Sequence, residues 1–244
     1  MSISGTRIAL VTGANKGIGF EIARQLGKAG YRILLGARDA TRGDAAAAKL
    51  KADGIDARAI GIDLDQPDSI AAAAEAIEAE EGRLDVLVNN AGIADRGDGP
   101  PGKANMAAVR RTFEVNFFGT LAVTQAMLPA LRKSPSARIV NISSGLGSLA
   151  RHSDPGWRFA QTKVLGYSAS KAALNMLTVQ LAAELKDSLI KVNSAEPGFT
   201  ATDLNNHRGT QTLAEGAAAA VRLATLPDDG PTGGVFSARG PEQW

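Results

Sequence analysis

Short apolar runs alternate with longer segments of helical spacing through almost the whole sequence. Several of the short runs are apolar at consecutive positions, which is typical of strands covered on both faces of a parallel sheet. The runs that predict strands are Ile8–Val11, Ile33–Leu35, Ala57–Ile62, Val86–Val88, Ile139–Ile142, Ile190–Val192 and Val235–Phe236. The pattern therefore predicts about seven strands.

The segments between these runs are rich in alanine and carry Leu or Ile at helical spacing. The predicted helices are Ile18–Ala29, Arg42–Lys51, Asp68–Glu80, Ala104–Leu131, Tyr167–Leu185 and Thr212–Leu226. Pro67 can open a helix, and Thr212 with Glu215 has capping-box spacing. Strictly alternating strands and helices predict an α/β fold, a doubly wound parallel sheet with helices on both faces. Since no linker interrupts the pattern, we expect residues 1–244 to form a single domain.

Charge and composition exclude several classes of function. The 27 Lys and Arg nearly balance 25 Asp and Glu and are scattered, so we expect no nucleic-acid partner. There is no cysteine, and two histidines, His152 and His207, are too few for a zinc cluster, so we expect no metal. Residues 1–5 lack signal-peptide features, and no apolar stretch could span a bilayer. We therefore expect a soluble, cytoplasmic protein with no membrane partner.

A glycine-rich segment, Thr12–Gly19, joins the first strand to the first helix. Backbone N–H groups at a helix N-terminus attract a pyrophosphate, and glycines let it approach closely. A glycine loop alone is a weak signal that also fits a tight turn, but its place in an α/β repeat favours a dinucleotide.

Tyr167 and Lys171 stand four residues apart on a predicted helix, so both side chains project from one face. Lowering a tyrosine pKa from ~10 to about 7 requires roughly 4 kcal/mol. A lysine ammonium at about 4 Å in an effective dielectric of ~20 supplies roughly that amount. The spacing thus predicts an activated proton donor, although an ordinary amphipathic helix with a solvated lysine also fits it.

Further motifs follow in order along the chain. They are Asp63-Leu64, Asn89-Asn90-Ala91-Gly92, Asn116, Ser143-Ser144, Tyr167 with Lys171, and Pro197-Gly198 with Thr202. With the glycine loop, this series resembles the short-chain dehydrogenase/reductase family over residues 7 to 240. The nearest resemblance is to the NADPH-dependent carbonyl reductases, through Asn15–Gly19, Ala37-Arg38-Asp39, Asn116–Thr120 and the tail Glu242-Gln243-Trp244. It implies a Rossmann-type sheet and reduction of ketones, aldehydes or quinones.

The resemblance also implies roles for individual residues. Tyr167 would donate a proton to the carbonyl oxygen, Ser144 would hydrogen-bond the same oxygen, and Lys171 would tune Tyr167 and hold the nicotinamide ribose. Asn116 would bind water that links Lys171 to solvent. The residues implied to bind cofactor are Gly13, Asn15, Lys16, Gly17, Ile18, Gly19, Arg38, Asp63, Leu64, Asn89, Ala91, Gly92, Tyr167, Lys171, Pro197, Gly198 and Thr202.

The end of the second strand predicts NADP(H) rather than NAD(H). NAD-dependent enzymes place an acid there to bind the adenosine ribose hydroxyls, but this chain has Ala37 followed by Arg38. A guanidinium suits a ribose 2′-phosphate, and Lys16 can reach the same group from the glycine loop. We expect Asp39 to point away or to brace Arg38.

The chain departs from the family pattern in two places. Between Ser144 and Tyr167 it inserts Arg151–Phe159, which could form a wall or lid of the substrate pocket or a surface loop anchored by its aromatic side chains. Monomeric carbonyl reductases insert more residues here, so the resemblance favours a monomer or homodimer over a tetramer. Glu196 stands where the family commonly has an uncharged residue, and the sequence assigns it no role.

Three rival functions remain open from the sequence. Gly166–Ser170 nearly matches a nucleophile elbow, and Asp203 and His207 follow in the order of a hydrolase triad. A non-catalytic NADP(H) sensor would keep the glycine loop alone. Within the enzyme class, a secondary-alcohol dehydrogenase or a β-ketoacyl-type reductase would share the catalytic residues, because substrate choice lies in the loops. The sequence leaves the small-molecule substrate unidentified.

Overall fold

The computed structural model describes residues 5–244 and contains one eight-stranded sheet in the order β3-β2-β1-β4-β5-β6-β7-β8. Residues 1–4, on which the expectation of no leader peptide depends, lie outside the described part. The strands are β1 Ile8–Val11, β2 Arg32–Ala37, β3 Ala57–Gly61, β4 Val86–Asn89, β5 Arg138–Ile142, β6 Lys191–Ala195, β7 Val235–Ser237 and β8 Gly240–Pro241. The seven predicted parallel strands are confirmed, and β8 is an unpredicted two-residue strand antiparallel to β7.

The eight helices of the described residues follow the predicted segments, except that one predicted segment is divided and one short helix, α6, was not predicted. They are α1 Gly17–Lys28, α2 Ala40–Ala52, α3 Pro67–Glu81, α4 Met106–Phe113, α5 Thr120–Arg132, α6 Leu149–His152, α7 Leu165–Glu184 and α8 Leu213–Ala224. Pro67 occupies the first turn of α3, and Thr212 and Glu215 form the predicted capping box of α8. Among residues 5–244, no helix combines the length and apolar character needed to cross a bilayer.

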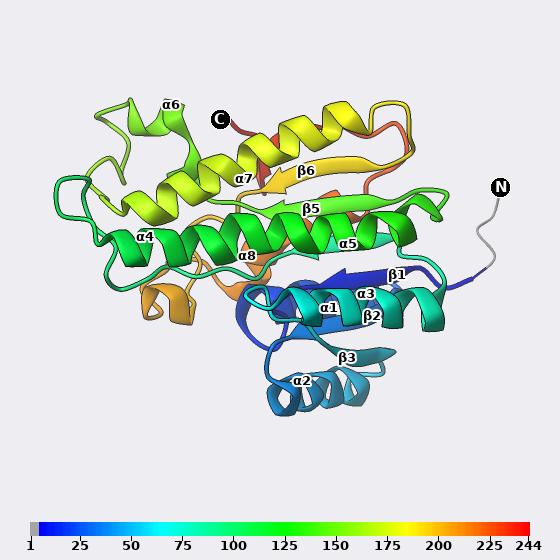
Figure 1. Ribbon diagram of the computed structural model, residues 1–244. Helices are drawn as coiled ribbons and strands as arrows, with labels where there is room; N and C mark the ends of the chain where they lie inside the picture. The colour runs from blue at the N-terminus through cyan, green and yellow to red at the C-terminus, as the bar shows by residue number, and fades with distance from the viewer. Residues whose placement is uncertain (1–4) are drawn as a thin grey trace.

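Helices cover both faces of the sheet, as the sequence predicts (Figure 1). Helices α1, α2 and α8 share one apolar cluster with the sheet, and α3, α5 and α7 share the other. Consecutive residues of β1 alternate between them: Ala9 and Val11 belong to the first cluster, Ile8 and Leu10 to the second. This explains why the strand is apolar at every position.

The long helix predicted over Ala104–Leu131 is interrupted. A π-helical segment, Glu114–Gly119, lies between α4 and α5 and contains Asn116. π-Bulges are rare and frequently mark functional sites. A side chain at Gly119 would meet Leu64, with Cβ atoms 2.6 Å apart, so the segment packs closely on the loop after β3.

The chain builds outward from β1 in both directions. It first adds β2 and β3 on one side and then β4, β5, β6 and β7 on the other. The crevice at the carboxyl ends of β1 and β4 is therefore the topological switch point, where open α/β sheets bind their ligands. In Figure 1 these strand ends point left, toward the side where α6 and the start of α4 and α7 lie.

Candidate active site

The glycine loop is packed directly against the segment that follows β4. Gly13 has φ 62°, and a side chain there would place Cβ 2.9 Å from the Cα of Ala91. Thr12 Oγ1 accepts hydrogen bonds from the backbone N–H groups of Asn90 and Ala91, each at 3.0 Å. The Asn90 amide donates to Thr12 O at 2.9 Å and to Gly13 O at 3.2 Å. Two sequence motifs thus form one rigid floor.

The start of α1 offers free backbone donors above this floor. In the described part of the chain, the N-cap residue Lys16 makes no side-chain capping bond, and the first turn holds no acidic residue. A Cβ at Gly19 would overlap the amide of Asn90 and lie 2.8 Å from Gly13 O, so glycine is required for this close packing. Uncapped N–H groups at a helix N-terminus fit a pyrophosphate.

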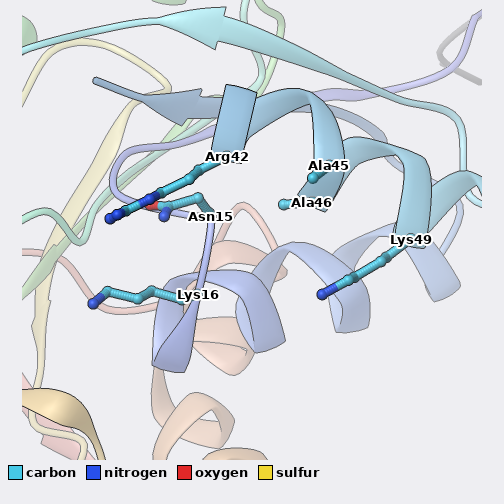
Figure 2. Close-up of a pocket in the computed structure, with 6 residues that line it drawn as sticks. All are labelled: Asn15, Lys16, Arg42, Ala45, Ala46 and Lys49. Carbon is cyan, nitrogen blue, oxygen red and sulfur yellow. The ribbon is translucent and has the colours of Figure 1, made fainter. Parts of the chain in front are cut away.

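A cationic pocket of about 290 Å³ opens beside the glycine loop. It is lined by Asn15, Lys16, Arg42, Ala45, Ala46 and Lys49. In Figure 2 the side chains of Asn15, Lys16 and Arg42 extend toward the same side, and Lys49 lies farther along α2. Lys16 and Arg42, whose side chains extend toward the same side, fit an anion such as a 2′-phosphate. Arg42, with Thr41 and Gly43 part of the resemblance to carbonyl reductases, was not expected to bind cofactor, although it lies on the first turn of α2, four residues beyond Arg38.

The Asp39 side chain caps the N-terminus of α2 and interacts with Arg42 instead of Arg38. Its carboxylate accepts from Arg42 N at 2.9 Å and lies 3.7 Å from Arg42 Nε. Arg38 is exposed at the end of β2. Of the two expected roles for Asp39, bracing Arg38 is therefore wrong, and the carboxylate braces Arg42 instead.

Lys16 reaches across the groove to the loop after β6. Its Nζ lies 2.5 Å from Asp203 Oδ2, and His207 Nε2 lies 2.8 Å from Asp203 Oδ1. The hydrogen bond from Lys16 lowers the pKa of the Asp203 carboxyl below its usual value. The predicted phosphate ligand thus has an acidic partner in this structure, one that the sequence did not indicate.

Lys171 is buried at the centre of the site. Only 4% of it is exposed, its Nζ donates to Ile142 O at 2.7 Å, and burial lowers its pKa to about 8. A Cβ on Gly92 would lie 3.5 Å from Lys171 Nζ and 3.2 Å from Asn116 Oδ1. The structure therefore brings together residues that are 79 positions apart in the chain.

Asn116 connects the loop after β4 to the helix that bears Tyr167. Its Oδ1 accepts from Ile93 N at 2.8 Å, and its Nδ2 donates to Ile93 O at 2.9 Å and to Ser170 Oγ at 3.0 Å. It is completely buried. The π-helical segment places this amide so that α7 and the β4 loop are held together.

The two neighbouring serines have different environments. Ser143 is 2% exposed, and its hydroxyl donates to Asn175 Oδ1 at 2.6 Å, inside the core. Ser144 is half-buried, its hydroxyl accepts from Leu146 N at 3.2 Å, and its interaction with the Tyr167 hydroxyl lowers the pKa of that tyrosine. Ser144 is thus the serine that faces the tyrosine.

Tyr167 does not have the lowered pKa that the sequence analysis expected from Lys171. Burial raises its pKa, the hydrogen bond with Ser144 lowers it, and the negative charge of Glu196 raises it further. The Lys171 Nζ lies 5.8 Å from the ring centroid, and burial lowers the pKa of Lys171 to about 8. In this structure Tyr167 therefore stays protonated at neutral pH.

The side chain of Asn89 is held inside the sheet. It is buried, and its amide Nδ2 donates to Thr124 Oγ1 and to Asn141 Oδ1, each at 2.9 Å. Among the described residues its Oδ1 has no hydrogen-bond partner. The side chain thus joins β4 to β5 and α5 through its Nδ2.

The remaining expected cofactor residues lie at the ends of β3 and β6. Asp63 Oδ1 accepts from Asp65 N at 3.2 Å, and Leu64 is 9% exposed against Gly119. After β6, Gly198 follows Pro197 with φ 74°. Thr202 precedes the 3-10 turn Asp203–Asn205 that meets Lys16. Both strand ends border the crevice described above.

The inserted segment lies beside the Pro197-Gly198 turn. Edge-to-face contacts run from His152 to Trp157, to Phe159 and to Phe199, with ring centroids 5.1, 5.6 and 5.4 Å apart. The Arg158 guanidinium lies 4.5 Å from the Phe159 ring centroid. The insertion is thus anchored by its aromatic residues, and His152 is half-buried beside Trp157.

The hydrolase alternative finds no support in this geometry. Ser168 lies in the first turn of α7, and among residues 5–244 its buried hydroxyl has no hydrogen-bond partner. Asp203 and His207 contact each other on an exposed loop. A nucleophile needs a base within hydrogen-bond reach, which Ser168 lacks here.

The fold and the site together define a dinucleotide-binding α/β protein, and comparison with known proteins gives the family. The family model described as short chain dehydrogenase matches residues 7–213. Carbonyl reductase (NADPH) 3 of Mus musculus is 38% identical over 93% of this chain and 93% of its own length. Carbonyl reductase (NADPH) 1 of Homo sapiens is 34% identical over 99% of both.

Solved structures agree with this relationship. An NADPH-bound carbonyl reductase from chicken fatty liver superposes with a TM-score of 0.85 at 27% identity and covers 98% of this chain and 99% of its own. Salutaridine reductase from Papaver somniferum gives a TM-score of 0.82 at 29% identity, with 95% and 99% coverage. The chain belongs to the short chain dehydrogenase family of oxidoreductases, and its relatives include the carbonyl reductases.

Proposed function

We propose that this protein reduces the carbonyl group of a small ketone, aldehyde or quinone to an alcohol with NADPH. The observation that carries the proposal is the convergence of Ser144, Tyr167 and Lys171 at the carboxyl edge of the sheet, beside an uncapped helix N-terminus. The similarity to carbonyl reductases of mouse and human supports the same chemistry.

The residues present fit the cofactor. The tight packing at Gly13 and Gly19 and the free N–H groups of α1 fit the pyrophosphate, and the pocket beside Lys16 and Arg42 fits a 2′-phosphate. Arg38 is exposed directly after β2, four residues before the pocket residue Arg42, and would bind the same phosphate. When bound, the reduced nicotinamide supplies a hydride to the carbonyl carbon.

The side chains of the site supply the proton. Tyr167 stays protonated at neutral pH and donates to the carbonyl oxygen as the negative charge develops there. Ser144 hydrogen-bonds the same oxygen and lowers the cost of that charge. Lys171, with a pKa of about 8, is mostly protonated at pH 7 and stabilises the phenolate left behind. Asn116 donates to Ser170 of α7 and so holds the helix that carries Tyr167 and Lys171 against the loop after β4.

The reverse reaction uses the same groups. The relatives include a (+)-neomenthol dehydrogenase of Capsicum annuum, 31% identical over 96% of both chains. A secondary-alcohol dehydrogenase or a β-ketoacyl-type reductase therefore remains the alternative of the same family. A non-catalytic NADP(H) sensor would have no need for the contact between Ser144 and Tyr167.

Three further expectations complete the proposal. We propose that residues 1–244 act as one NAD(P)-binding domain, because a single sheet links the first strand to the last. We also propose a monomer or homodimer, since the insertion flanks the start of α7. The expected site of action is the cytoplasm.

The test is a panel of quinones, diketones, keto esters and aldehydes, each followed by NADPH absorbance with the purified protein. Turnover of at least one carbonyl that a Tyr167→Phe variant does not support is expected. Binding of NADPH without turnover of any member would favour the sensor, and turnover unaffected by Tyr167→Phe would reject the assigned chemistry.

A further inference from the structure

Glu196 is an acidic residue inside the site, and the mechanism above does not use it. Its side chain is 14% exposed, and its negative charge acts on the Tyr167 hydroxyl. It directly precedes Pro197 at the end of β6. A carboxylate in this place opposes the formation of a phenolate and therefore needs an explanation.

Arg151, from the inserted segment, is the cation that faces Glu196. Its Nη1 lies 3.6 Å from Glu196 Oε1, and its Nη2 donates to Glu242 in the C-terminal tail. The guanidinium also lies 6.0 Å from the ring centroid of Trp157. Arg151 is 23% exposed, so this pair is largely screened from solvent by protein.

The pair is built against the backbone that carries the catalytic serine. A Cβ at Gly145 would overlap Arg151 Nη1 and lie 3.3 Å from Glu196 Oε1. Gly145 directly follows Ser144, which is hydrogen-bonded to Tyr167. The two opposite charges thus meet one residue away from the group that contacts the tyrosine.

We propose that Arg151 is a positioning residue for the reduction: it holds Glu196 against the Ser144-Gly145 turn and balances the negative charge that acts on the Tyr167 hydroxyl. The inference rests on the proposed function, in which Tyr167 is the proton donor. It assigns the inserted segment a second role besides its aromatic contacts.

In the described residues three charged groups lie at or act on Tyr167, and Arg151 acts on it through Glu196, with Glu242 as the second partner of its guanidinium. Lys171 lies one turn along the same helix, Glu196 follows β6, and Arg151 belongs to α6. Asp98, from the loop before α4, accepts a hydrogen bond from the Tyr167 backbone N–H. Without Arg151 the carboxylate of Glu196 is uncompensated, so the phenolate is less favourable and Tyr167 becomes a weaker acid.

The chain permits a direct measurement, because it has only two tyrosines. In a Tyr31→Phe background, tyrosinate absorbance reports Tyr167 alone, read within milliseconds of a pH jump so that alkaline unfolding does not interfere. Arg151→Met is expected to move the ionisation of Tyr167 to higher pH, and Glu196→Gln to lower pH. In the double variant Arg151→Met, Glu196→Gln, the effect of losing Arg151 disappears.

Arg58→Met is the matched control. Arg58 lies on the distant strand β3, is 25% exposed and pairs with Glu81 of α3 at 3.2 Å. It should leave the Tyr167 titration unchanged. In turnover at pH 7, Arg151→Met is expected to lower kcat about tenfold with little change in KM for NADPH, because a weaker acid slows proton transfer.

An unchanged Tyr167 titration in Arg151→Met would overturn the inference. So would a shift of the Tyr167 titration by Arg151→Met that is as large in the Glu196→Gln background as in the parent. If Arg151→Met fails to fold, Glu196→Gln and Arg151→Lys provide the same comparison, and absence of a shift to lower pH in Glu196→Gln also overturns it. The titration needs no substrate. Loss of the proposed function is therefore seen separately, as absence of turnover by the parent protein.

Discussion

The carboxylate of Asp98 caps the helix that carries Tyr167. Its Oδ2 accepts from Tyr167 N at 2.8 Å and its Oδ1 from Gly166 N at 2.9 Å, while Leu165 N donates to Gly99 O at 3.0 Å. The N-cap residue of α7, Val164, has no side chain able to do this. The loop before α4 therefore fixes where α7, the helix that carries Tyr167, begins.

Replacing Asp98 with alanine is expected to lower kcat about tenfold with KM for NADPH within about twofold. Two charge-assisted hydrogen bonds are lost, so the first turn of α7 frays and Tyr167 is less often in line with the substrate. The free energy of unfolding should fall by about 2 kcal/mol, as measured by urea denaturation.

Asp95→Ala is the control for this prediction. Asp95 lies in the same loop, accepts from Gly97 N at 2.8 Å and lies 3.9 Å from Arg111 Nε, and in the described residues no hydrogen bond or ion pair joins its side chain to α7. An equal loss of kcat in both variants would mean that the loop, and not the cap on α7, is responsible. Asp98→Asn should fall between Asp98→Ala and the parent, because an amide oxygen still accepts one bond.

The two serines after β5 give a second prediction. Ser144→Ala should reduce kcat by at least about a hundredfold with little loss of stability, because its hydroxyl contacts Tyr167 and the developing oxyanion. Ser143→Ala should instead lower the free energy of unfolding by about 1 kcal/mol, since it strands Asn175, and leave kcat within about threefold. Parallel thermal melts and steady-state kinetics check both, and the reverse pattern would exchange the two assignments.

Much of the fold could be predicted from hydrophobic spacing alone. Both faces of β1 are apolar because both are covered, and the sequence shows this directly at Ile8–Val11. The proximity of Tyr167 and Lys171 could also be predicted, because they lie on one helix at a spacing that fixes their relative direction. Local geometry was sufficient in these cases.

The missed features depend on contacts between distant segments. Asp98 acts on Tyr167 across 69 positions, and Lys16 meets Asp203 across 187 positions. No periodicity encodes such pairs. The π-helical segment around Asn116 was missed because α- and π-helical sequences have the same composition, and the difference arises from packing on Leu64.

The lowered pKa expected for Tyr167 was wrong for an electrostatic reason. The sequence argument placed one cation beside the phenol and counted neither burial nor Glu196. Burial acts on both partners, because it also lowers the pKa of Lys171 to about 8. The proton affinity of Tyr167 therefore depends on its burial and on the segments after β5 and β6, which carry Ser144 and Glu196.

The low pKa of Lys171 predicts the pH dependence of the reaction. Below pH 8 the ammonium is protonated and stabilises the phenolate, and above pH 8 it loses its proton and that stabilisation. Because the pKa of Tyr167 is raised, the tyrosine remains protonated through this range. Thus kcat/KM for NADPH, which reports the free enzyme, should be level from pH 6 to 7 and fall tenfold per pH unit well above about pH 8. A level profile up to pH 10 would contradict the role of Lys171.

Preference for NADPH should depend on three cations and not on two. Arg38 and Lys16 follow from the sequence, and the structure adds Arg42, which lines the same pocket as Lys16 and is held in place by Asp39. Each charge-assisted contact with a phosphate is worth roughly 1.5–3 kcal/mol, so loss of any one should lower kcat/KM for NADPH at least about tenfold, with little change for NADH.

Lys49→Ala provides a control within that pocket, because Lys49 lies two turns farther along α2 than Arg42 (Figure 2). Lys49→Ala should reduce kcat/KM for NADPH far less than Arg42→Ala does.

Asp203→Asn is expected to have the opposite effect. It releases Lys16 from its carboxylate partner, so NADPH should bind a few-fold more tightly, while NADH binding stays the same. Steady-state kinetics with NADPH and with NADH measures these effects in the parent and in each variant. Equal kcat/KM for NADPH and NADH in the parent would reject the NADPH assignment outright. A parent that prefers NADPH but is insensitive to Arg42→Ala would restrict phosphate recognition to Arg38 and Lys16.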